Sequence, residues 1–386
     1  MVDKQKLGNA SRVLLHILLY LWLIIGVAIN VQWAFRNDDT RDYGSFYAAG
    51  KAFLEGKNPY LSTYPEIFVV EVNGSMVASP NLNPPVSLYL TSLFAKLDLH
   101  QGFSLWRILN VIFYLLGVAG LVLAIKPKPT WKWILISLSI SGLWHIVELG
   151  QIYVPIFLIL VLMILLFQKD RRVLAGVCLG AAVAIKPNFA LILLCILLVK
   201  EWRVSISAVV TTFALSLIPL LDRGMEIYLQ WFQAQSGYTG SWIPGNSSIP
   251  GFFSRFGLTI PGLVVAALAA LVVFGLIIRN RWSSIRAMDA GLLLSILCSP
   301  IAWPGYSIFA IAPLFRLTNH RGISWIMFIL ALPIVLIYWL AVPGTFLYIL
   351  FGSWYGIAWV LLLIWTITNS KGSTGFAIEQ ELRGKS

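Results

Sequence analysis

The chain has 386 residues, of which 59% are hydrophobic and 11% are charged, and its mean hydropathy is +0.82. These values exclude a soluble domain and predict an all-α, polytopic integral membrane protein. The net charge of +12 does not indicate a nucleic-acid partner, because the basic residues are scattered in short turns between apolar segments. The cysteines lie in apolar segments and predict neither a disulfide framework nor a metal site; they are Cys178, Cys195 and Cys298.

Apolar segments along the chain predict about twelve membrane crossings within a single domain, residues 1–368. Several of these segments are shorter than the roughly 20 residues that cross a bilayer. Such segments must be shielded by neighbouring helices, enter a cavity or lie where the membrane is thin. Residues 369–386 are predicted to form a cytoplasmic tail. The predicted crossings are residues 13–33, 103–125, 131–147, 152–168, 172–186, 188–200, 203–221, 258–278, 287–303, 305–317, 323–341 and 345–368.

The distribution of lysine and arginine predicts the orientation of the chain. With the N-terminus inside, 19 of the 28 Lys and Arg fall in cytoplasmic segments. Every predicted cytoplasmic turn obeys the positive-inside rule. We therefore predict a multi-pass protein of a bacterial plasma membrane, with both termini in the cytoplasm.

Two long segments are predicted to lie on the outer face of the membrane. The first outer loop is residues 34–102, and the second outer loop is residues 222–257. A crossing over residues 86–97 would invert the charge pattern of everything that follows, so we predict a helix lying at the interface there. Asp38 and Asp39 are predicted to be exposed loop residues without a chemical role.

Asp42 is the leading candidate for a catalytic residue. It lies in the first outer loop close to the end of the first apolar segment, where a carboxylate can take a proton from an attacking hydroxyl group. The alternative interpretation is structural: Asp42 caps a helix over residues 43–55 that stops at Gly56. Aspartate is common at helix caps, so the residues alone favour the cap.

Two basic residues on the predicted outer face are candidates for binding a phosphate group. Lys186 ends a short apolar segment just before Pro187, and a charge at membrane depth usually has an anionic partner or lines a wet cavity. Arg255 precedes an apolar segment, and a guanidinium binds phosphate through two parallel hydrogen bonds. The alternatives are that Lys186 extends to the headgroups and that Arg255 makes an ordinary headgroup contact.

Three further residues at predicted outer turns are candidates for substrate contacts. Gln151, together with Glu148, faces a polar cavity or belongs to a tight turn at Gly150. Asn246 either contacts a sugar or serves as a turn residue. Trp303 either stacks on a sugar ring or anchors the chain at the interface.

Short motifs follow one another in a specific order along the chain. They are Asp42-Tyr-Gly-Ser-Phe-Tyr-Ala-Ala-Gly50 with Gly56-Lys-Asn-Pro-Tyr60, Asn83-Pro-Pro85, Leu149-Gly-Gln151, Ala175-Gly176 with Ala184-Ile-Lys-Pro187, Asn246-Ser-Ser248 with Arg255, and Ser299-Pro-Ile-Ala-Trp303. In order and placement, these motifs resemble glycosyltransferase family 87, membrane proteins of the GT-C fold that are similar to polyprenol-phosphate-mannose-dependent mannosyltransferases. The resemblance covers nearly the whole chain. It departs from the family pattern at Asn83, where relatives usually have Tyr, and at Pro304-Gly305-Tyr306, where relatives often have histidines.

The resemblance implies a GT-C-type bundle and an inverting transfer of a hexose, taken as mannose, from a polyprenyl-phosphate donor to a glycolipid or polysaccharide acceptor. Asp42 is then the general base, and Lys186 and Arg255 stabilise the leaving phosphate, so no acid is needed. The implied partners are the donor, the acceptor and membrane lipids, and neither a cofactor nor a metal ion is required. The residues predicted to contact substrate are Tyr47, Tyr60, Gln151, Asn246 and Trp303.

Two other classes of function compete with this interpretation. A lipid-linked-sugar flippase or transporter of the cell envelope would share the many crossings and the cations near the membrane. The sequence contains no pair of related halves, and it has two long outer loops that a carrier does not require, so the glycosyltransferase is favoured. An assembly subunit for envelope polysaccharide would not depend on Asp42 at all.

Overall fold

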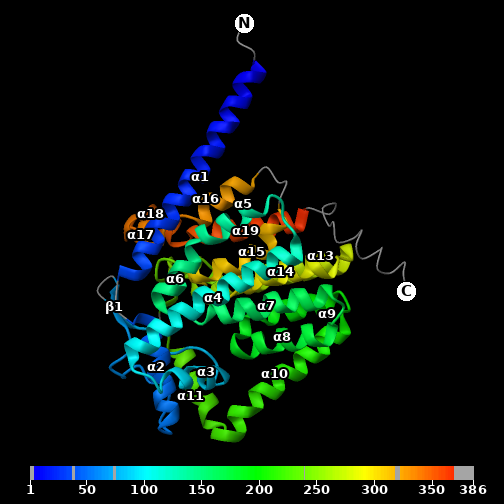
Figure 1. Cartoon of the computed structure of the whole chain (residues 1–386). Coiled ribbons are helices and arrows are strands. Elements are labelled where there is room, and N and C mark those ends of the chain that lie inside the picture. Colours follow the sequence, from blue (N-terminus) through cyan, green and yellow to red (C-terminus); the bar gives the residue numbers. More distant parts are fainter. Residues whose placement is uncertain (1–3, 37–39, 73–74, 239, 318–321, 369–386) are drawn as a thin grey trace.

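The fold is a bundle of helices, many of which pack side by side (Figure 1). The computed structural model describes residues 4–36, 40–72, 75–238, 240–317 and 322–368. The predicted cytoplasmic tail and the two loop residues Asp38 and Asp39 lie outside these ranges. The described residues therefore form an all-α membrane protein, to which one short β-hairpin is added.

Helix length limits how many of the predicted crossings are spans by themselves. Four helices are long and apolar enough to cross a membrane, and three bent helix pairs reach that length only together, with bends of 44°, 81° and 55°. The described residues thus contain four to seven candidate spans. The four are α1 (Lys4–Arg36), α4 (Leu99–Ile125), α10 (Trp202–Arg223) and α13 (Thr259–Asn280). The pairs are α5 (Thr130–Ser139) with α6 (Ser141–Leu149), α16 (Ile323–Leu330) with α17 (Ile334–Leu340), and α18 (Phe346–Gly352) with α19 (Trp354–Thr368).

The other apolar helices are shorter than the roughly 20 residues that cross a bilayer. α7 is apolar on all sides, which explains why it lies between α4 and α8 and has no face for water. A Cβ at Gly117 of α4 would lie 2.5 Å from the ring of Phe157, so glycine permits the close approach of α4 and α7. These helices are α7 (Tyr153–Gln168), α8 (Arg172–Ile185), α9 (Ala190–Leu198), α14 (Ser284–Leu297) and α15 (Ile311–Phe315).

Three amphipathic elements gather at one end of the bundle (Figure 1): α2 (Arg41–Leu54), α3 (Val86–Phe94) and α11 (Glu226–Gly237). α2 packs so closely on α3 that a Cβ at Gly50 would lie 2.7 Å from the backbone of Thr91. Phe53, Leu88 and Ile227 form a small apolar cluster that joins the three helices. The helix predicted over residues 86–97 is thus present as α3, which at nine residues is too short to cross a membrane.

A two-stranded antiparallel hairpin, which was not predicted from the sequence, follows α2. Strand β1 (Val69–Val72) pairs with β2 (Ser75–Ala78), with Val69 opposite Ala78. The ladder continues one residue further, because the amide of Ser79 donates to the carbonyl oxygen of Phe68 at 3.0 Å. The hairpin therefore fixes the position of Ser79.

Candidate active site

Asp42 lies in the first turn of α2, which begins at Arg41. Its carboxylate accepts hydrogen bonds from the hydroxyl group of Ser79 at 2.9 Å and from the side-chain amide of Gln151. The interpretation of Asp42 as the N-cap is therefore wrong. The companion prediction is confirmed: α2 ends at Leu54, and Gly56 follows with a φ of +70°. The carboxylate is thus held from two sides by residues that are distant in the sequence.

The C-terminal turn of α6 holds the N-terminal turn of α2 through two neighbouring pairs. Gln151 donates to Asp42, and Oε1 of the buried Glu148 lies 3.6 Å from Nη2 of Arg41. Arg41 has a φ of +41°, a backbone conformation that non-glycine residues rarely adopt. Such strain persists where the surroundings determine it. The ion pair with Glu148 connects the residue next to Asp42 to α6.

Gly150 allows α6 to end where Gln151 reaches Asp42. Its φ of +71° reverses the chain in the left-handed conformation. A Cβ at Gly150 would lie 2.5 Å from Cβ of Tyr43 and 2.9 Å from the ring of Phe103. The indole of Trp106 donates to the carbonyl oxygen of Gly150 at 2.9 Å. Glycine is therefore required both for the turn and for the approach of α2.

A cavity of about 330 Å³ opens beside Asp42, a size within the range of roughly 300–1,000 Å³ typical of small-molecule sites. It lies where α2, the segment after β2 and α11 meet the ends of the bundle helices. Within the described residues, no group of three or more His, Cys, Asp or Glu is placed to hold a metal ion. The polar and indole side chains that line the cavity include Asp42, Ser79, Asn83, Gln151, Lys186, Asn188, Trp231, Gln235, Tyr238 and Trp303.

Lys186 lines the same cavity as Asp42. It follows the last residue of α8, where the backbone becomes extended before Pro187. Its Nζ donates to Oδ1 of Asn83 at 2.9 Å and lies 5.4 Å from the ring centroid of Tyr153. Across the described parts of the chain, no carboxylate lies within ion-pair distance of this ammonium group. Its charge is thus available to an anionic group that enters the cavity.

The surroundings of Asp42 favour proton uptake. Burial raises the pKa of Asp42 above its usual range, and it outweighs the hydrogen bonds from Ser79 and Gln151 and the charges of Arg41 and Lys186, which lower the pKa. A carboxylate with a raised pKa is a better general base near neutral pH. Asp42 therefore combines a raised proton affinity with access to a cavity.

Four of the eight residues predicted for the site line this cavity: Asp42, Gln151, Lys186 and Trp303. Two others lie outside its lining. The buried hydroxyl group of Tyr60 donates to the carbonyl oxygen of Asn83 at 3.1 Å, behind the side chain that accepts from Lys186. The hydroxyl group of Tyr47 donates to the carbonyl oxygen of Leu97 at 3.1 Å. Tyr60 thus supports the cavity wall, and the substrate contacts of both tyrosines stay predictions.

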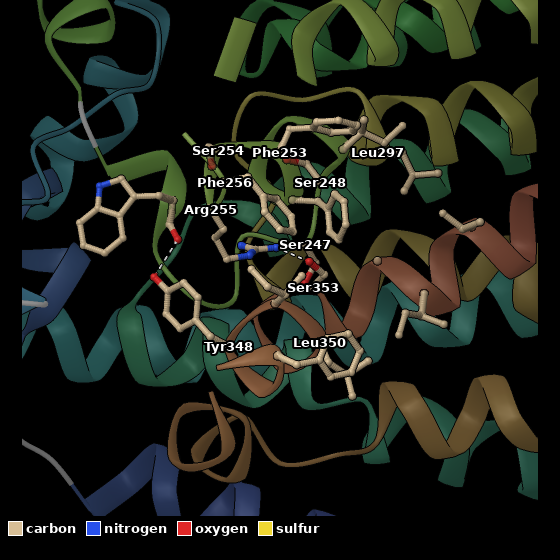
Figure 2. A pocket seen from close by; sticks show the side chains of 18 of the residues that line it. Ser247, Ser248, Phe253, Ser254, Arg255, Phe256, Leu297, Tyr348, Leu350 and Ser353 are labelled. Carbon is tan, nitrogen blue, oxygen red and sulfur yellow. Dashed lines mark hydrogen bonds between the residues drawn. The ribbon is translucent and has the colours of Figure 1, made fainter. Parts of the chain in front are cut away.

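The last two predicted residues lie in the second outer loop, and neither lines the Asp42 cavity. Asn246 is fully buried, and its amide fixes the chain that leads to Trp303. Arg255 lines a second, larger cavity, shown in Figure 2. The amide of Asn246 donates to the carbonyl oxygens of Ser241 and Pro300 and accepts from the Ala302 amide and the Ser248 hydroxyl group.

Several residues of the cavity were not predicted from the sequence. Ser79 could have been found, because Asn73-Gly74 between the segments Val69-Val-Glu-Val72 and Ser75-Met-Val-Ala78 is a strong hairpin signal, and a hairpin places the residue after it. Asn83 was noted only as part of a motif. Gln235 and Tyr238 had no signal of their own, because they reach the cavity only through the packing of α11.

The family model described as Glycosyltransferase family 87 matches residues 81–300. The Alpha-(1->3)-arabinofuranosyltransferase of Corynebacterium glutamicum is 25% identical over 368 residues, which cover 89% of this chain and 80% of that protein. No solved structure matches the chain. More than half of the chain thus matches one family model, and the chain belongs to glycosyltransferase family 87.

Proposed function

We propose that this protein transfers a sugar from a polyprenyl-phosphate donor to a hydroxyl group of a glycolipid or polysaccharide on the extracytoplasmic face of a bacterial membrane. One observation carries the proposal: in a chain of glycosyltransferase family 87, a half-buried carboxylate and an ammonium group without a carboxylate partner among the described residues line one cavity. Asp42 is the general base, and Lys186 binds the donor phosphate. Gln151 and Trp303 line the space in which the sugar is held.

The proposed reaction is a single displacement at the anomeric carbon of the sugar. The acceptor oxygen forms a bond to this carbon while the bond from the carbon to the phosphate oxygen breaks. The proton of the acceptor hydroxyl group moves to Asp42, and the electron pair of the broken bond leaves with the polyprenyl phosphate. Lys186 stabilises the charge that develops on the phosphate. The proposal includes no cofactor, because the phosphate ester itself supplies the leaving group.

The motifs of this sequence and the name of the similar protein favour different sugars for the transfer. The motif pattern favours a hexose, taken as mannose. The similar protein from Corynebacterium glutamicum is named as an arabinofuranosyltransferase, which favours a pentofuranose as the second candidate. Both sugars fit the same reaction scheme, since Asp42 and Lys186 act on the hydroxyl group and the phosphate that either reaction shares.

The proposed arrangement in the membrane is the GT-C type. We propose that the bent pairs and the short apolar helices together complete about twelve crossings, with the short ones shielded inside the bundle. Both termini are cytoplasmic, and the two outer loops lie outside. α2 and α3 lie near the outer interface, so that a lipid-linked donor reaches the cavity from the membrane.

A donor comparison tests the proposed function. The purified full chain is placed in liposomes with polyprenyl-phosphate mannose or polyprenyl-phosphate arabinofuranose, each labelled in the sugar, and with envelope glycolipids and polysaccharides as acceptors. We expect one donor to give labelled product. Movement of intact labelled donor between leaflets, with no new glycosidic bond, would support the flippase instead. No labelled product from either donor, with the acceptors shown to be competent, would contradict the proposal.

The pH dependence of transfer tests the role of Asp42. The base acts only when ionised, so kcat/KM falls as the pH drops through the pKa of Asp42. The acid limb of the pH profile is the range in which kcat/KM falls as the pH drops. Because burial raises the pKa of Asp42, we expect the acid limb to lie at a pH above about 3.9, the pKa of an exposed aspartate. Ser79→Ala removes a hydrogen bond that favours the ionised form, so the limb should move upward by about 1 pH unit. A limb that stays in place or moves to lower pH in this variant would argue against the assignment.

A further inference from the structure

A large groove of about 1140 Å³ lies between the second outer loop and the C-terminal helices. It is bounded by α12 (Ile249–Ser254), α13, the end of α14, α18 and α19. Its lining is mainly apolar and includes Val265, Leu297, Ile357 and Leu361. Val265 lies on α13 and Leu361 on α19, and both side chains are exposed. Because both helices are apolar and belong to candidate spans, the groove opens toward the hydrocarbon of the membrane.

Arg255 brings a positive charge into this apolar groove. Figure 2 shows its guanidinium group pointing to Ser353, whose hydroxyl oxygen accepts a hydrogen bond from Nη2. Nη1 donates to the carbonyl oxygen of Asn246 at 3.0 Å, and Nε is buried without a hydrogen-bond partner among the described residues. Burial lowers the pKa of Arg255 to about 10, so the group is still charged at neutral pH. Both of its described partners are neutral oxygens.

The charge of Arg255 has no anion to balance it in the described part of the chain, where no carboxylate lies within ion-pair distance. A buried charge is unfavourable unless it is paired. Ser248, Ser254 and Thr345 also line the groove, and their hydroxyl groups donate to oxygen atoms of the chain. One guanidinium beside a long apolar channel matches a lipid whose headgroup carries a phosphate.

The groove is separate from the Asp42 cavity, since the two share no lining residue. A donor with its phosphate on Arg255 would therefore hold its sugar in a space that Asp42 does not line. The two spaces are joined through Asn246, which accepts from Arg255 at its backbone and donates at its side chain to the carbonyl oxygen of Pro300, in the wall of the Asp42 cavity. An occupant of the groove would thus support the wall of that cavity without entering it.

We propose that this groove is a binding site for an anionic phospholipid of the surrounding membrane, held by its phosphate on Arg255 and by its acyl chains between α13 and α19. A phospholipid fits better than the donor because a donor phosphate on Arg255 would hold its sugar in a groove that shares no lining residue with the Asp42 cavity. The site is independent of the proposed reaction. Its ligand stabilises the protein and is not consumed.

Lipid retention tests the site directly. The full chain is reconstituted in vesicles of equal parts phosphatidylglycerol and phosphatidylcholine and extracted in mild detergent, and the lipid bound per protein is measured by mass spectrometry. We expect phosphatidylglycerol to be retained and to fall about tenfold in Arg255→Gln, which loses a charge-assisted hydrogen bond. Val360→Trp should also lower retention, because it narrows the groove at a position without contact to the Arg255 hydrogen bonds. Arg223→Gln is the matched control, since Arg223 lines neither cavity.

Three results would overturn the proposal, and two of them would identify a different occupant. Unchanged retention in both Arg255→Gln and Val360→Trp would show that the groove does not hold the lipid. Displacement of phosphatidylglycerol by an equal amount of polyprenyl phosphate would make the groove part of the donor site. If inorganic phosphate alone stabilised the full chain against thermal unfolding as much as phosphatidylglycerol does, the groove would be an anion site that does not use the apolar channel. Because binding and unfolding are measured without transfer, the outcome does not depend on the proposed enzyme activity.

Discussion

Replacing Asp42 with asparagine is expected to reduce sugar transfer by about 10²- to 10⁴-fold, the usual contribution of a general base. The substitution preserves size and removes only the ability to take the proton. Ser79 can still donate to the remaining oxygen, and the amide of Gln151 can turn to accept from the new amide group, so α2 should stay in place. The measurement is the initial rate of labelled product formation, with donor binding measured in parallel.

Asp98→Asn is the matched control for this variant. Asp98 is another carboxylate of the first outer loop at the start of a helix, where it accepts hydrogen bonds from the backbone amides of His100 and Gln101. Asparagine caps a helix about as well as aspartate, so this variant should transfer sugar at the normal rate. Normal transfer by Asp42→Asn would exclude Asp42 as the base. Loss of both transfer and donor binding would indicate instead that Asp42 organises the cavity.

Replacing Lys186 with methionine should lower kcat by roughly 10²- to 10³-fold, as for the loss of one group that stabilises developing charge. The phosphate gains charge as it leaves, so the ammonium group contributes more to the transition state than to donor binding, and KM should change less than kcat. Methionine fills a similar volume, and among the described residues the substitution removes only the hydrogen bond from Nζ to Asn83. Lys186→Arg should recover part of the rate, because it restores the charge.

Lys57→Met controls for the general loss of a positive charge in the first outer loop. Lys57 is exposed and pairs with Glu55 at 2.7 Å, so its replacement should leave transfer unchanged. A rise in KM at constant kcat for Lys186→Met would assign Lys186 to donor binding only. If Lys186→Met kept the full rate while Arg255→Gln abolished transfer, the donor phosphate would lie in the Arg255 groove and not beside Asp42.

Local sequence patterns predicted the helices well and their geometry poorly. The apolar segments at residues 323–341 and 345–368 were each interpreted as one crossing, but the first bends by 81° between α16 and α17, and the second bends by 55° between α18 and α19. Hydropathy reports only how apolar a segment is, and it does not report the angle at a break. Pro333, just before α17, was the visible signal for the first bend.

The role of Asp42 illustrates what spacing alone cannot separate. An aspartate near the start of a helix is most often a cap, and the sequence favoured that interpretation. The structure places it one residue inside the helix, where its carboxylate turns to Ser79 and Gln151. These partners are set by a hairpin and by the end of α6. Neither position follows from the residues next to Asp42.

The sequence by itself determined the class of this protein, because apolar content and the distribution of charge are properties of composition and local order. It also determined the family, because the motifs keep their order along the chain. Only the tertiary structure decided which cation accompanies Asp42. Lys186 and Arg255 are equivalent candidates in the sequence, yet one lines the Asp42 cavity and the other lines a separate apolar groove. The physical reason is that a site joins residues more than 100 positions apart, such as Lys186 and Asn83, through helix packing that no local pattern encodes.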